Sequence, residues 1–303
     1  MKSRDVEKVN LVFLLTAILY LVASFVVSAL QRDGSSLPFP ALILISQFAL
    51  FIAPFLYAVQ KGHFTERTGL KPLSLTNGIL VMLMALCLNP LLTFVNGLSQ
   101  CFVKAPTTDL IIEQAKSYGF VQMFLLVALI PAFCEELVYR GVFFRTYRAQ
   151  AVVPGAMLSA LLFGIMHGNL NQFIYAMLMG FIFALTVYAT KSLVASMLMH
   201  LTINGLSTIL MFAVGDSELA EESANIELTV PYVLKVYTGP AVVGSILAFL
   251  LFKKIAKRCE TWDHIREAFA AEDKLGKFLR LFTLPLAITV IGMIALMIYA
   301  EFA

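Results

Sequence analysis

Long apolar segments recur along this chain and constrain its fold more than any other feature. They lie near residues 10–30, 41–60, 77–99, 119–145, 152–168, 171–189, 192–213, 232–252 and 281–301. A helix needs about 20 apolar residues to cross the hydrocarbon core of a bilayer. Lipid cannot hydrogen-bond an open backbone, and the runs lack the alternation of barrel strands, so each run predicts a helix. The sequence therefore predicts an all-α, polytopic transmembrane bundle of about eight to nine spans.

The composition supports a membrane protein. Hydrophobic residues make up 60% of the 303 residues and charged residues 14%, whereas soluble domains carry about 45–50% and about 25%. The net charge of +3 gives no argument for a nucleic-acid partner. No internal repeat divides the chain. We therefore expect residues 1–303 to form a single integral membrane domain whose partner is the lipid bilayer.

Basic residues predict the orientation of the chain. They gather at the N-terminus and in loops 61–76, 145–150 and 253–280, which fall on one side when nine spans alternate. Because Lys and Arg mark cytoplasmic loops, we expect a cytoplasmic N-terminus. Loop 214–231 has five acidic and no basic residues and falls outside.

Within loop 253–280, apolar residues recur at intervals of three and four. This spacing is typical of an amphipathic helix on the inner membrane surface, or of a linker helix packed on the bundle. These residues are Ile255, Cys259, Trp262, Ile265 and Phe269.

A few strongly polar side chains interrupt the apolar runs. They are Glu135, Glu136 and Arg140 in run 119–145, His167 in run 152–168, and His200 and Asn204 in run 192–213. An acidic group at the bilayer centre costs at least about 2.5 kcal/mol, so such residues indicate a functional site. At about 1.5 Å per residue, Glu135, His167 and His200 lie roughly 15, 21 and 13 Å from the inner interface. Similar depths predict that they meet in one water-filled pocket.

Spacing within the helices predicts separate tasks for these side chains. Glu136 and Arg140 are four residues apart and can pair on one helix face, whereas Glu135 points about 100° away. His200 and Asn204 have the same four-residue spacing and present two hydrogen-bonding groups side by side. Phe163, one turn before His167, can wall the pocket.

Peptide hydrolysis uses this set of groups. A carboxylate in a low-dielectric pocket is a good proton acceptor for water, and a histidine can share that water. A second histidine and an asparagine can donate to the developing oxyanion, where one donor contributes about 3–4 kcal/mol. The residues alone leave open which glutamate is the base.

Other interpretations remain open. Taken singly, Glu136–Arg140 is typical of a structural ion pair, and a lone histidine or asparagine in a span is typical of an interhelical hydrogen bond. A proton-coupled transporter could use Glu135, His167 and His200 as a relay. A catalytically silent membrane scaffold is a third possibility, and it should tolerate Glu135→Gln, whereas a protease should not.

The three motifs resemble those of the type II CAAX prenyl proteases, also called the CPBP family of CAAX proteases and bacteriocin-processing enzymes. The family pattern is EExxxR, FxxxH and HxxxN. Here it reads Glu135-Glu136-Leu-Val-Tyr-Arg140, Phe163-Gly-Ile-Met-His167 and His200-Leu-Thr-Ile-Asn204. The resemblance covers residues 119–213, the expected catalytic core.

The resemblance implies an intramembrane endopeptidase with a site that opens to the cytosol. Glu135 and His167 would activate the water, His200 and Asn204 would form the oxyanion hole, and Glu136 and Arg140 would support them. The implied substrates are membrane-associated or lipidated proteins or peptides. Short connections between the spans favour a bacterial-type member in the cell membrane.

The resemblance leaves a cofactor open. Family members are often called metalloproteases, and Glu135, His167 and His200 could provide three zinc ligands with an open position. The histidines lack HExxH spacing, so we favour a glutamate mechanism without a metal.

Overall fold

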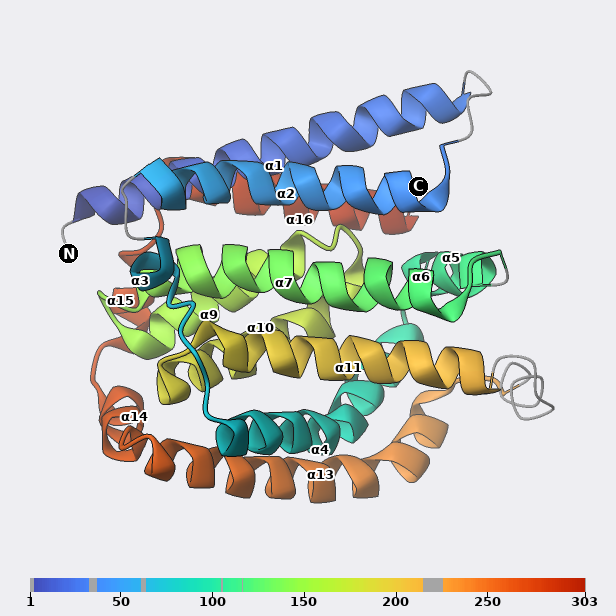
Figure 1. Ribbon diagram of the computed structural model, residues 1–303. Coiled ribbons are helices and arrows are strands. Elements are labelled where there is room, and N and C mark those ends of the chain that lie inside the picture. Colours follow the sequence, from blue (N-terminus) through green and yellow to red (C-terminus); the bar gives the residue numbers. More distant parts are fainter. Residues whose placement is uncertain are drawn as a thin grey trace.

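The computed structural model describes residues 3–32, 37–60, 64–104, 106–115, 117–214 and 226–302 (Figure 1). Within these ranges the regular elements are helices, and no strand occurs. Eight helices are long and apolar enough to cross a membrane. Seven of them are α1 (Ser3–Arg32), α2 (Phe39–Gln60), α4 (Leu75–Gln100), α10 (Leu170–Thr190), α11 (Leu193–Val214), α13 (Val230–Arg258) and α16 (Leu284–Phe302). The predicted all-α, polytopic bundle is confirmed.

The eighth long helix runs from Phe120 to Tyr147 and changes its winding along the way. It consists of α6 (Phe120–Phe124), the π-helical η1 (Leu125–Leu129), α7 (Ile130–Glu136), the π-helical η2 (Leu137–Phe144) and α8 (Arg145–Tyr147). Pro131, which lacks a backbone N–H, lies in the first turn of α7, directly after the first π-helical stretch. Such wide turns occur frequently at functional sites, and here they flank Glu135 and Glu136.

The run 152–168 was expected to be one of nine spans, but its helix is too short to cross the membrane. Helix α9 (Val152–Ile165) has 14 residues, a length of about 21 Å at 1.5 Å per residue, whereas the hydrocarbon core measures about 30 Å. The helix ends because Gly168 adopts φ +71°, a left-handed conformation that suits glycine. The side chain of Asn169 then accepts a hydrogen bond from Gln172 N and starts α10. His167 therefore lies on a turn inside the bundle.

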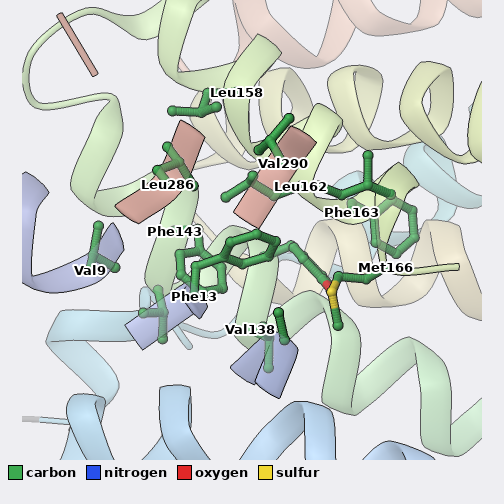
Figure 2. Close-up of a cluster of buried hydrophobic side chains, with 14 of the residues drawn as sticks. Val9, Phe13, Val138, Phe143, Leu158, Leu162, Phe163, Met166, Leu286 and Val290 are labelled. Atoms are coloured by element: carbon green, nitrogen blue, oxygen red, sulfur yellow. The ribbon is translucent and has the colours of Figure 1, made fainter. Parts of the chain in front are cut away.

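A shared core holds the helices around that turn. Helix α9 packs against α10, and α1 packs against α2 and α16. Figure 2 shows where apolar side chains of α1, the Phe120–Tyr147 helix, α9 and α16 meet. Phe163 belongs to this core, so the wall of the site is continuous with the packing that fixes α9.

The described basic loops lie at one end of the bundle. The start of α1, α3 (Phe64–Thr68), α14 (Trp262–Ala270) and α15 (Lys274–Leu279) share that end, on the left of Figure 1. The opposite end carries α5 (Pro106–Ala115) and the end of α16. Residues 215–225, which hold most of the expected acidic loop, lie outside the described part of the chain. The grouping agrees with the predicted topology, and the cytoplasmic assignment stays a prediction.

The expectation of a single amphipathic helix after residue 253 is wrong, because two helices share the predicted apolar positions. Helix α13 continues to Arg258, and Glu260 adopts φ +54°, which ends the regular winding. The predicted apolar positions Trp262, Ile265 and Phe269 then fall on one short helix, α14, and Ile265 is buried against the bundle. This geometry is that of a surface helix packed on α13.

Candidate active site

A cavity of about 300 Å³ lies among α1, α2, α5, the Phe120–Tyr147 helix, α9, α10 and α11. Five of the residues singled out in the sequence line it, namely Glu135, Phe163, His167, His200 and Asn204. Glu136 and Arg140 are absent from the lining and are fully buried. The structure thus divides the predicted polar residues into a group that faces the cavity and a pair that lies behind it.

The buried pair forms the ion pair that its four-residue spacing predicts. Arg140 Nη1 donates to Glu136 Oε1 across 2.8 Å, and both side chains are 0% exposed. His200 Nδ1 lies 3.0 Å from the same carboxylate oxygen. The Glu136 carboxylate therefore sits between a guanidinium and an imidazole, and it joins the Phe120–Tyr147 helix to α11.

The Arg140 guanidinium is held between aromatic rings. Its central carbon lies 4.3 Å from the ring centroid of Phe163 and 5.2 Å from that of Phe183. A Cβ at Gly180 would approach Arg140 Nη2 and Ala160 Cα to 3.0 Å each. The absence of a side chain at Gly180 therefore lets α9, α10 and the guanidinium approach closely.

Phe163 explains the spacing of the second motif. Its backbone oxygen lies 2.9 Å from His167 Nδ1, four residues later. Because a carbonyl can only accept, His167 Nδ1 carries the proton and Nε2 keeps a free lone pair. The Phe163 ring also contacts the His167 ring edge to face, with centroids 4.9 Å apart. One phenylalanine thus fixes the tautomer and the orientation of the histidine.

Glu135 is the carboxylate that faces the cavity. Its side chain is 13% exposed, and Oε2 lies 3.9 Å from His200 Nε2. Gln47 of α2 donates from Nε2 to Glu135 Oε1 across 2.8 Å. The adjacent glutamates therefore have different surroundings, as the 100° separation predicts.

His200 and Asn204 place two polar nitrogens at one point of the cavity wall. Asn204 Nδ2 lies 3.2 Å from His200 Nε2 and donates to the backbone oxygen of Val127 across 3.0 Å. His200 Nε2 can accept the second hydrogen of this amide while that ring nitrogen carries no proton. When His200 carries both ring protons, Asn204 Nδ2 and His200 Nε2 are both donors, and one acceptor can bridge them.

Sequence reasoning missed several polar residues of the lining, among them Gln47, which donates to Glu135, and Tyr139. Gln47 lies inside the apolar run 41–60, so the depth rule that selected Glu135 would also have found it. Tyr139 lies within the first motif, but at one of its variable positions. Its side chain is buried and its ring contacts Phe163 with centroids 5.0 Å apart.

The alternative zinc ligands Glu135, His167 and His200 all line the cavity. Among the described residues, however, no three histidine, cysteine or carboxylate side chains are grouped closely enough to hold a metal ion. Glu135, His167 and His200 in this arrangement do not fit a three-ligand zinc site.

Comparison with known proteins identifies the segment that carries these motifs. Residues 117–206 match the family model described as Rce1-like, type II CAAX prenyl endopeptidase Rce1-like. This confirms the predicted resemblance over that segment, which is less than half of the chain. No curated protein matches, and no solved structure matches. The family match and the eight apolar helices support an integral, multi-pass membrane protein.

Proposed function

We propose that this protein is an intramembrane endopeptidase that hydrolyses apolar segments of membrane-associated or lipidated proteins or peptides. The observation that carries the proposal is the convergence of Glu135, His167, His200 and Asn204 on one cavity between apolar helices. The match of residues 117–206 to a prenyl endopeptidase family supports the same reaction class.

In this mechanism, Glu135 and His167 Nε2 hold a water between them, and Glu135 takes one of its protons. The water oxygen attacks the peptide carbonyl carbon, and the carbonyl oxygen becomes an oxyanion. Asn204 Nδ2 and protonated His200 Nε2 donate to that oxyanion. Glu135 then passes its proton to the leaving amide nitrogen, the C–N bond breaks, and an acid and an amine are released.

Glu136 and Arg140 act from behind the cavity. The Glu136 carboxylate 3.0 Å from His200 Nδ1 stabilises the protonated ring and fixes its orientation. Arg140 balances the charge of Glu136, since an unpaired carboxylate would be costly in this fully buried position. Together they keep a positively charged donor available at the oxyanion without placing an arginine in the cavity.

The lining of the cavity indicates the substrate class. No lysine or arginine belongs to the described residues that line it. The charge that the mechanism places there, protonated His200, is used by the oxyanion, and many of the lining side chains are apolar, so we expect a peptide bond within an uncharged, apolar segment to be preferred. The bilayer around it concentrates the same class of substrate.

The test is cleavage of a quenched peptide library in liposomes by wild type, Glu135→Gln and a matched control, Glu113→Gln. Glu113 lies on α5 and is exposed. A general base contributes about 10²–10⁴-fold, so we expect Glu135→Gln to lose at least a hundredfold in kcat/KM while Glu113→Gln keeps wild-type activity. Equal cleavage by wild type and Glu135→Gln would remove Glu135 as the base. Absence of cleavage by correctly folded wild type would contradict the protease assignment, and proton flux would then test the transporter alternative.

A further inference from the structure

Two buried polar atoms in the cavity wall have no hydrogen-bond partner among the described residues. They are the side-chain oxygen Oε1 of Gln47 and the hydroxyl of Tyr139. Buried polar groups are paired in the great majority of cases, and an orphan group requires an explanation. The other described orphan atoms belong to the Glu136–Arg140 pair or to Ser99, outside the cavity lining.

The orientation of the Gln47 amide is fixed by its neighbour. Its nitrogen faces Glu135 Oε1 at 2.8 Å. The opposite orientation would place an amide oxygen against a carboxylate oxygen, with no proton between two acceptors. The Gln47 oxygen is therefore an acceptor that is turned away from Glu135 and left without a donor.

The two orphan groups are chemically complementary to a peptide backbone. Gln47 Oε1 can only accept, and the Tyr139 hydroxyl can donate. A peptide segment presents an N–H donor and a carbonyl acceptor at every residue. The residues line the cavity but the two atoms themselves have almost no accessible surface, so a substrate would satisfy both groups when their side chains turn toward it, whichever apolar side chains it carries.

We infer that Gln47 and Tyr139 bind the backbone of the substrate beside Glu135. Gln47 Oε1 accepts a substrate N–H, while its nitrogen holds the Glu135 carboxylate in place. The Tyr139 hydroxyl donates to a substrate carbonyl. This inference rests on the proposed endopeptidase function and adds two substrate-contacting residues, Gln47 outside the three motifs and Tyr139 at a variable position of the first motif. Because both contacts are to the main chain, they accept different apolar sequences.

The experiment combines variants of Gln47 with a scan of N-methylated peptides. Gln47→Met keeps an unbranched side chain of similar length but removes the amide, and Gln47→Leu is a second variant. The control is Gln60→Leu, at the exposed end of the same helix. The substrate is a peptide that wild type cleaves, prepared in a series with one backbone N–H at a time replaced by N–CH₃.

We expect Gln47→Met to lower kcat/KM about ten- to hundredfold, as for the loss of one buried hydrogen bond. At one peptide position, N-methylation should lower the kcat/KM of wild type by a factor similar to that of the Gln47→Met substitution. The same N-methylation should lower the kcat/KM of Gln47→Met by less than a further factor of two. Tyr139→Phe should lower kcat/KM about tenfold, and Gln60→Leu should match wild type. If Gln47 had only a structural role, its substitution would lower kcat/KM by the same factor for every peptide, whichever N–H is methylated.

Two outcomes would overturn the inference, and they are distinguishable. If wild type cleaves peptides but every N-methyl peptide loses the same factor in wild type and in both Gln47 variants, the backbone contact is wrong and the protease assignment stands. If folded wild type cleaves no peptide, the proposed function fails and the inference fails with it.

Discussion

The buried Glu136–Arg140 pair makes a quantitative prediction about stability. Arg140→Met keeps much of the side chain's volume but removes the guanidinium that lies 2.8 Å from Glu136 Oε1. The carboxylate would then remain fully buried beside the His200 ring without its guanidinium partner. Breaking a buried ion pair from one side costs about 3–5 kcal/mol, because an uncompensated charge stays behind. The smaller value already shifts the ratio of folded to unfolded protein by more than about a hundredfold.

A double variant separates the charge from the packing. Replacing a buried pair by apolar residues of similar volume is often neutral in stability, so Glu136→Leu/Arg140→Met should recover most of the loss. The exposed control is Arg266→Met on α14, whose side chain is 68% exposed. We expect it to change the free energy of unfolding by less than about 0.5 kcal/mol.

The assay is unfolding in mixed micelles with increasing dodecyl sulfate. Far-UV circular dichroism reports helix content, and the single tryptophan, Trp262, reports the environment of α14. A loss in Arg140→Met no larger than in Arg266→Met would refute the reasoning. So would a double variant whose loss equals the sum of the two single losses, since the penalty would then come from packing rather than from an unpaired charge.

Two further predictions concern the packing of α10 and the cofactor. Gly180→Ala should destabilise the protein by about 1–3 kcal/mol through overpacking against Ala160 and Arg140. Gly239→Ala, in open space on α13, should be neutral or stabilise the protein by up to about 1 kcal/mol. Thermal unfolding in detergent measures both, and a change of the unfolding temperature in the same direction for the two variants would contradict the close approach at Gly180. A zinc chelator should leave peptide cleavage unchanged, and a loss of cleavage that added zinc restores would establish a metal mechanism.

The sequence predicted the features that depend on helical periodicity. The four-residue spacings placed Glu136 beside Arg140 and His200 beside Asn204, because residues one turn apart share a face regardless of the rest of the fold. The apolar runs predicted the long helices for a similar reason, since lipid leaves few alternatives.

Features that depend on tertiary contacts were less predictable. The run 152–168 is apolar throughout, and only the conformation of Gly168 and the capping by Asn169 end α9 early. The hydrogen bond of Gln47 to Glu135 joins residues on different helices, 88 positions apart, and no local spacing indicates it. The roles of the site residues in catalysis remain predictions that the variants above test.

The short helix α9 also has a consequence for how the chain enters the membrane during synthesis. At about 21 Å the helix is shorter than the hydrocarbon core, so in lipid alone one of its ends and the turn beside it would lie in hydrocarbon, where each unsatisfied polar group costs several kcal/mol. Helix α9 is therefore not expected to be stable in the bilayer as a single transmembrane helix, whereas α2 and α16 are long enough to be. We expect it to leave the insertion machinery together with α10, as a hairpin whose tip carries His167. The polar interior would then form while these helices insert, and not in an apolar bundle that is already complete.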